Sequence, residues 1–91
     1  MLFMAVSSWE PGKRDEVAKR SLKIGDATLP KGVKSLGQWT VIGGNRSFRL
    51  LDVEDPRVMY ESARQWTDLF SIEYFPVLET AEVLKIISGK K

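Results

Sequence analysis

Two side chains of opposite charge, Arg49 and Glu73, lie in stretches of the sequence that are otherwise rich in apolar residues. An arginine in a partly apolar cavity presents a planar set of donors that suits a carboxylate or an enolate. A glutamate that is partly removed from water can abstract a proton from such a ligand. If one strand separates the strands of these residues, their backbones are about 10 Å apart, and the long side chains can meet over Ser7. We therefore take Arg49 and Glu73 as candidate catalytic residues.

The same pair has a second interpretation, which the chemistry of ion pairs favours. An arginine–glutamate pair between two sheets more often fixes the register of two subunits than it takes part in catalysis. Trp39 and Phe75 also allow two interpretations, because aromatic rings wall most ligand pockets and also fill many dimer interfaces. The residues predicted to line either a ligand pocket or a dimer interface are Phe3, Ser7, Trp39, Arg49, Glu73 and Phe75.

The composition excludes several kinds of chemistry. The 91-residue chain contains no Cys and no His, so it lacks thiol nucleophiles, imidazole bases and the ligands of nearly all transition-metal sites. We therefore predict no metal and no cofactor. The net charge of +2 is too small to indicate a nucleic-acid partner. Gly43-Gly44-Asn45 lacks the spacing of a phosphate-binding loop and is typical of a tight turn between two strands.

The apolar residues alternate between a period of two, typical of strands, and a period of about 3.6, typical of helices. The pattern predicts strands over 2–8, 33–42, 46–53 and 69–77, and helices over 13–28, from Asp55-Pro56 through the stripe Met59, Ala63 and Trp66, and over 80–87. Residues 88–91 are predicted to be the frayed tail of a single domain covering residues 1–91. The order βαββαβ plus a C-terminal helix predicts an α+β chain with the ferredoxin-like fold. In that fold the first and third strands are central in an antiparallel sheet, and both crossover helices cover one face.

The alternation along the strands divides their side chains into two sets. The more uniformly apolar set is predicted to face the helices: Leu2, Met4, Val6, Phe48, Leu50, Phe70, Ile72 and Tyr74. The other set is predicted to form an open face: Phe3, Ala5, Ser7, Trp39, Val41, Arg49, Leu51, Ser71, Glu73 and Phe75. A face of this composition is too apolar to remain in water. We therefore expect two copies of the chain to pack face to face about a two-fold axis.

Several short motifs resemble a family of bacterial and archaeal proteins of unknown function and of about this length. The motifs are Met1-Leu2-Phe3-Met4, Leu29-Pro30-x-Gly32, Trp39, Asp55-Pro56, Trp66-Thr67-Asp68-Leu69 and Pro76-Val77. The resembled family belongs with the dimeric α+β barrels, which include cofactor-independent monooxygenases, muconolactone isomerase and ligand-sensing domains. The resemblance implies a homodimer with a cavity and assigns no reaction. Relatives that degrade haem use a histidine, which this chain lacks, so that activity is not expected.

The expected function is the binding of a small organic molecule by a homodimer, or service as an interaction module. The alternative is a cofactor-independent monooxygenase or isomerase acting on a small anionic or aromatic substrate, with Arg49 orienting the substrate and Glu73 as the base. The residues alone do not decide whether the chain is an enzyme. Residues 1–6 are apolar but far too few for a membrane span of about 20 residues. We therefore expect a cytoplasmic protein with neither a membrane nor a nucleic acid as its partner.

Overall fold

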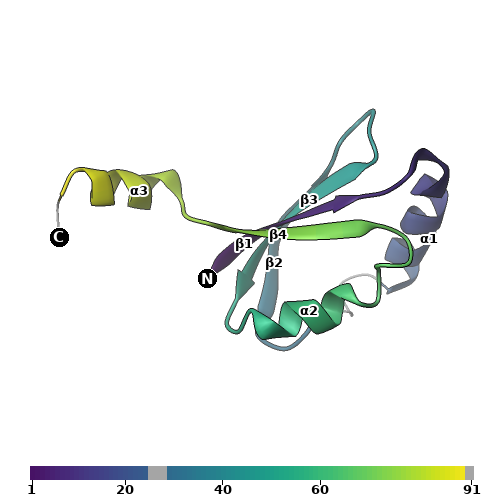
Figure 1. Cartoon of the computed structure of the whole chain (residues 1–91), viewed down its shortest axis with the longest axis horizontal. Helices are drawn as coiled ribbons and strands as arrows, with labels where there is room; N and C mark the ends of the chain where they lie inside the picture. Colours follow the sequence, from purple (N-terminus) through teal and green to yellow (C-terminus); the bar gives the residue numbers. More distant parts are fainter. Residues whose placement is uncertain (25–28, 90–91) are drawn as a thin grey trace.

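The computed structural model of the chain describes residues 1–24 and 29–89. Four antiparallel strands form one sheet in the order β2-β3-β1-β4. The strands are β1 (Leu2–Ser8), β2 (Val33–Thr40), β3 (Arg46–Val53) and β4 (Ser71–Val77). The helices are α1 (Arg14–Ile24), preceded by the 3-10 turn η1 (Pro11–Lys13), α2 (Arg57–Ala63) and α3 (Thr80–Ile87). The predicted α+β class is confirmed, and the arrangement is compatible with the ferredoxin-like fold (Figure 1).

Several helices and strands begin or end at residues other than those that the pattern predicts. β2 stops at Thr40, two residues early, and β4 begins only at Ser71. The second helix ends at Ala63, because the backbone amides of Gln65 and Trp66 bond to carbonyls three residues earlier and tighten the chain into turns. The end of the predicted first helix, residues 25–28, and the last two residues of the predicted tail lie outside the described residues.

The core lies between one face of the sheet and the helices α1 and α2. Its central cluster is Phe3, Ala5, Val33, Leu51, Val53 and Met59. Met59 belongs to α2, which runs alongside the sheet in Figure 1, and the other members come from three neighbouring strands. Val53 is fully buried, and Val17 extends the buried surface onto α1. These contacts supply the apolar burial that a short chain without disulfides needs in order to fold.

The two faces of β1 and β3 are exchanged relative to the prediction. Phe3 pairs in register with Leu51, and both are buried in the core with Ala5. The side chains predicted to face the helices from these strands therefore lie on the open face: Leu2, Met4, Val6, Phe48 and Leu50. For β4 the prediction is confirmed, since Ile72 and Tyr74 pack against the core. Because β1 is apolar at both alternating sets, its pattern fits either orientation, and only the packing of α2 decides between them.

The open face of the sheet is apolar along most of β1 and at the centre of β3, and its charged side chains lie at the ends of β3 and, with Glu73, on the edge strand β4. Trp39 and Phe75 lie on its two edge strands and are 56% and 47% exposed. The indole of Trp39 lies over Gly37, where a methyl group would come within 2.6 Å of the ring. Arg46 and Asp52 stand at the two ends of β3 on this face. An apolar middle with a charged rim is the composition of a protein interface.

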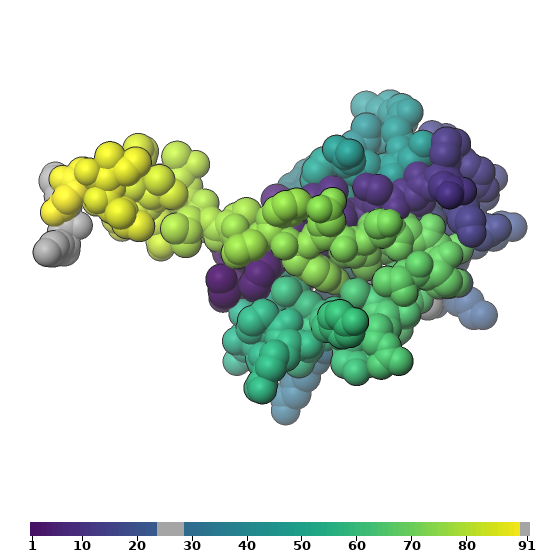
Figure 2. All heavy atoms as spheres, viewed as in Figure 1, coloured from purple at the N-terminus to yellow at the C-terminus, as the bar shows by residue number. Residues whose placement is uncertain are grey.

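The C-terminal helix α3 stands away from the rest of the molecule. The chain leaves the end of β4 and reaches α3 well beyond the sheet and the other two helices (Figures 1 and 2). No residue of α3 is buried. The molecule is consequently elongated, with extents of 49 × 31 × 17 Å. None of the described helices has the length and apolar character that a membrane span requires.

Candidate functional site

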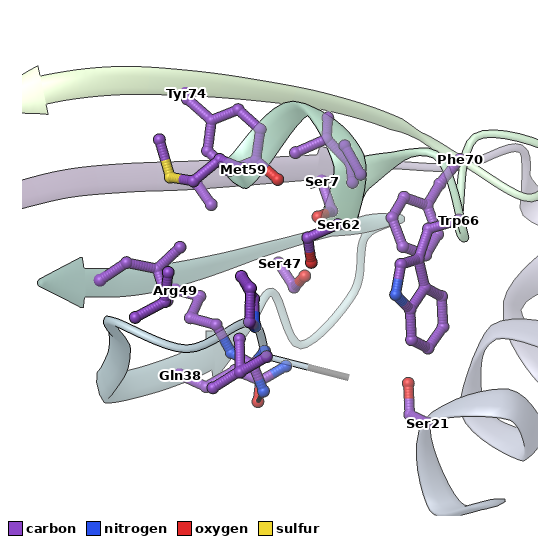
Figure 3. A pocket seen from close by; sticks show the side chains of 17 residues that line it. Ser7, Ser21, Gln38, Ser47, Arg49, Met59, Ser62, Trp66, Phe70 and Tyr74 are labelled. Atoms are coloured by element: carbon purple, nitrogen blue, oxygen red, sulfur yellow. Dashed lines mark hydrogen bonds between the residues drawn. The ribbon is translucent and has the colours of Figure 1, made fainter. Parts of the chain in front are cut away.

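A cavity of about 300 Å³ lies between the core side of the sheet and the helices (Figure 3). Its polar lining consists of Ser7, Ser21, Gln38, Ser47, Arg49, Ser62 and Tyr74. Its apolar lining includes Met59, Trp66, Phe70 and Ile72. A concave space of this size that is lined by both apolar and polar groups is typical of a site for a small organic molecule.

Arg49 carries the one formal charge among the described residues that line this cavity. It lies in register with Ala5 of β1, so its side chain leaves β3 on the core side of the sheet. The Nη2 of Arg49 donates a hydrogen bond of 2.9 Å to Oε1 of Gln38. Gln38 is the register neighbour of Arg49 on β2. Figure 3 shows the two side chains together at one wall of the cavity, which therefore presents a positive charge to its interior.

Tyr74 supplies a neutral hydrogen-bond donor on the opposite side of β1. It also lies in register with Ala5, but from β4. Burial raises the pKa of the Tyr74 phenol above its ordinary value of 10.0, and the positive charge of Arg49 opposes part of that rise. The phenol therefore stays protonated at neutral pH and keeps its O–H available as a donor.

Hydroxyl groups occupy the floor of the cavity. Ser7 of β1 and Ser47 of β3 face one another in register on the core side of the sheet. Ser62 of α2 lines the same cavity (Figure 3). Each hydroxyl can donate one hydrogen bond and accept others, so this group adapts to a polar ligand without adding charge.

An aromatic wall, braced by an ion pair, closes the end of the cavity nearest α1. The rings of Trp66 and Phe70 are stacked with their centroids 5.3 Å apart. The guanidinium of Arg20 lies 5.7 Å from the centre of the Trp66 ring. Arg20 also donates hydrogen bonds of 2.7 and 2.9 Å to the carboxylate of Asp68, and these bonds hold the pKa of Asp68 below its ordinary value. The brace joins α1 to the segment that follows α2.

The residues predicted as one site are divided between the two faces of the sheet. Arg49 lies beside Ala5, whereas Glu73 lies beside Val6, the next residue of β1. Successive residues of a strand point to opposite faces, so Arg49 and Glu73 cannot meet, and the prediction that they do is wrong. The prediction failed because residues 46–53 were given the wrong orientation, while Glu73 was correctly assigned to the open face.

The remaining predicted residues follow the same division. Ser7 lines the cavity with Arg49, and Phe3 lies deeper in the core on the same side. Trp39 and Phe75 share the open face with Glu73. The sequence alone did not predict Gln38, Ser47 and Ser62 as site residues, since nothing in the pattern distinguishes a polar residue that lines a cavity from one that faces water. The phenol of Tyr74 was recognisable as a proton donor, but its place beside Arg49 depends on the register.

A comparison with protein families matches residues 1–91 to the family described as "Domain of unknown function (DUF3303)". The chain belongs to the DUF3303 family. The expectation that it is a member of a family of short domains without an assigned function is thereby confirmed. A comparison with curated proteins gives no match.

The arrangement in this DUF3303 domain suits the binding of an anion better than a reaction that needs a strong base. The lining combines one guanidinium, one protonated phenol and several neutral hydroxyl or amide groups. In a partly apolar space, a positive charge attracts a negatively charged group more strongly than it does in water. Asp68 lies outside this lining and is engaged by Arg20, so it is not placed to act on a ligand.

Proposed function

We propose that this DUF3303 domain binds a small organic anion, such as a carboxylate, in the cavity between its sheet and its helices. The observation that carries the proposal is the position of Arg49, the one charged group in the described lining, among neutral donors. A planar carboxylate matches the planar donors of a guanidinium, and the O–H of Tyr74 can add a further bond. The ring of Trp66 offers an apolar surface for the carbon part of such a ligand.

The proposal is tested by titrating the purified protein with a panel of small aliphatic and aromatic carboxylates in a calorimeter. Native mass spectrometry of freshly purified protein adds a search for a molecule that co-purifies. Arg49→Met should lower the affinity for the best carboxylate at least tenfold, because it removes the charge and keeps much of the volume. Arg14→Met is the matched control, since Arg14 is exposed at the start of α1 and outside the cavity lining. Equal affinity in the Arg49→Met variant, or no binding by any carboxylate, would overturn the proposal and favour a pure interaction module.

The proposed assembly is a homodimer in which two copies pack their open faces together, as in a dimeric α+β barrel. Its support is the apolar composition of that face, on whose edge strands Trp39 and Phe75 are half exposed. Monomeric proteins seldom leave a contiguous apolar patch of this kind in water. Sedimentation velocity at micromolar concentration should show a dimer. Phe75→Glu should shift it to monomer, whereas Tyr60→Glu, which changes an exposed aromatic residue of α2, should not.

Catalysis on the same ligand, by a cofactor-independent monooxygenase or isomerase, is the second candidate function. The observation that favours it is the protonated phenol of Tyr74, which can donate to an enolate held by Arg49. Glu73 does not serve as the base in this version, because it lies on the other face of the sheet. An isomerase activity should fall at least a hundredfold in Tyr74→Phe, and a turnover unchanged by that substitution rules this role out.

A further inference from the structure

Three serine hydroxyls of the cavity are not needed to bind a carboxylate at Arg49. They belong to Ser7 of β1, Ser47 of β3 and Ser62 of α2. Within residues 1–24 and 29–89, none of these hydroxyls forms a hydrogen bond with another group of the chain. Each of them therefore has a donor and an acceptor to offer to a bound molecule. A ligand that left them without partners would lose binding energy, so they point to a polar group on the ligand besides its carboxylate.

The register of the strands places Ser7 well away from the charge of Arg49. Ser7 pairs with Ser47, and Arg49 pairs with Ala5, so Ser7 and Arg49 are one strand and two residues apart. Their Cα atoms are then about 8 Å apart, from strand spacings of about 4.8 Å and a rise of about 3.4 Å per residue. The guanidinium bonds to Gln38 on β2, on the side of β3 away from β1. A ligand held by Arg49 therefore reaches Ser7 with a group several bonds from its carboxylate.

The group that reaches the serines is neutral. Arg49 is the one charged residue in the described lining. A second carboxylate of the ligand would lie among neutral hydroxyls, with no cation beside it to offset the loss of its water. A hydroxyl group both donates and accepts hydrogen bonds, as the serine side chains do. The lining therefore favours a hydroxyl at this position of the ligand.

The carbon part of the ligand has aromatic side chains beside it. Phe70 lies past the Ser7 level of the sheet, because the next residue, Ser71, pairs with Ser8. Trp66 stacks on Phe70, and Figure 3 shows both rings at the end of the cavity away from Arg49. Aromatic rings pack favourably against one another, either stacked or edge to face. The cavity volume of about 300 Å³ is at the lower end of the range for small-molecule sites, which suits a molecule with a single ring.

We infer that the ligand is a single-ring aromatic carboxylate with a hydroxyl group remote from the carboxylate, an inference that rests on the anion binding proposed above. The carboxylate binds Arg49, the hydroxyl bonds to Ser7 and Ser47, and the ring lies beside Trp66. 4-Hydroxybenzoate is the simplest molecule of this class, and its two polar groups lie at opposite ends of the ring.

Calorimetric titration of the natural chain with four acids tests the inference. Benzoate, 2-hydroxybenzoate and 4-hydroxybenzoate have the same charge and the same ring. 4-Hydroxybenzoate should bind about fivefold more tightly than benzoate, because it adds hydrogen bonds to the serines. 2-Hydroxybenzoate should gain nothing over benzoate, since its hydroxyl lies beside the carboxylate. The fourth acid, trans-4-hydroxycyclohexanecarboxylate, keeps both polar groups without an aromatic ring and should bind about threefold more weakly than 4-hydroxybenzoate.

A double variant locates the hydroxyl of the ligand. Ser7→Ala combined with Ser47→Ala should reduce the preference for 4-hydroxybenzoate over benzoate to less than about twofold and leave the affinity for benzoate unchanged. Ser71→Ala is the matched control, since Ser71 is exposed at the start of β4 and outside the described lining. It should keep the full preference. Urea unfolding of both proteins confirms that the variants are folded before they are titrated.

The outcomes separate this inference from the proposed function. Equal binding of benzoate and 4-hydroxybenzoate by the natural chain, or a preference that survives in the double variant, refutes the hydroxyl contact. The anion site still stands in that case if Arg49→Met weakens the binding of both acids. A cyclohexane acid that binds as tightly as 4-hydroxybenzoate refutes the aromatic ring. If none of the acids binds, the inference and the proposed function fall together.

Discussion

Arg49 and Tyr74 project from the same face of the sheet on either side of Ala5, because each lies in register with that residue of the central strand β1. Two strand spacings separate their backbones by about 10 Å. A small anion between them can form an ion pair with the guanidinium and accept a hydrogen bond from the phenol. Residues 49 and 74 are far apart in the sequence, and the strand that aligns them, β1, begins at residue 2.

Replacing Tyr74 by Phe should weaken the binding of a carboxylate about three- to tenfold, because it removes one neutral donor and little volume. Calorimetric titration of the two proteins with the same ligand measures the difference. Tyr60→Phe is the control, since Tyr60 is exposed on α2 and outside the cavity lining. If both substitutions have the same effect, the phenol of Tyr74 does not contact the ligand.

The buried phenol should also affect the stability of the domain in alkali. Because the pKa of Tyr74 is higher in the folded chain than its ordinary value of 10.0, the folded state retains the proton where the unfolded state loses it. This contribution to stability is complete below pH 10 and is lost as the pH rises through the folded value. Urea unfolding from neutral to alkaline pH should therefore show a decline that is smaller in Tyr74→Phe.

Asp68→Asn should lower the melting temperature of the domain slightly, because it removes the carboxylate to which Arg20 donates two hydrogen bonds. The folded pKa of Asp68 lies below its ordinary value of 3.8. The ion pair therefore contributes above pH 3.8, and the contribution is lost as the pH falls through the folded value. The difference between variant and natural chain should shrink in acid and in high salt. Glu61→Gln, which breaks the exposed pair with Arg64, is the control and should have a smaller effect.

Gly32→Ala should destabilise the domain by about 1–2 kcal/mol, because the backbone at Gly32 has φ of +86° and a side chain there is strained. A methyl group would also come within 2.8 Å of Oε2 of Glu54. Gly12→Ala is the matched control, since nothing lies within 4 Å of its added carbon. Denaturant unfolding compares the two variants. Equal stabilities would mean that the turn relaxes without cost.

Gly37→Ala should weaken the proposed dimer more than it weakens the fold. The added methyl group displaces the Trp39 indole, which can swing away because it is 56% exposed. We expect a dissociation constant at least threefold higher and a shifted tryptophan emission, measured by sedimentation and fluorescence. In the control Gly43→Ala the added carbon meets nothing within 4 Å, and the dimer should be unchanged. A dimer as tight as the natural one in Gly37→Ala would place Trp39 outside the interface.

Local patterns in the sequence were sufficient for the class of fold. Alternating apolar residues and the break at Gly43-Gly44-Asn45 predict a hairpin, and the structure places β2 and β3 on its two sides. The absence of Cys and His determines which side chains are available for chemistry, since composition needs no coordinates. The apolar excess along β1 is typical of a strand that is covered on both faces.

Tertiary structure alone decided which residues share a face and therefore a site. Turning one strand over exchanges all its inward and outward residues, and a strand that is apolar on both sides permits either choice. The packing of Met59 against Phe3 and Leu51 settles that choice for β1 and β3. With this orientation, Arg49 lies in the cavity on the same face as Tyr74, whereas Glu73 lies on the open face. A periodic pattern of apolar residues indicates that a side chain is buried. Which residues surround that side chain depends on contacts between segments that are far apart in the sequence.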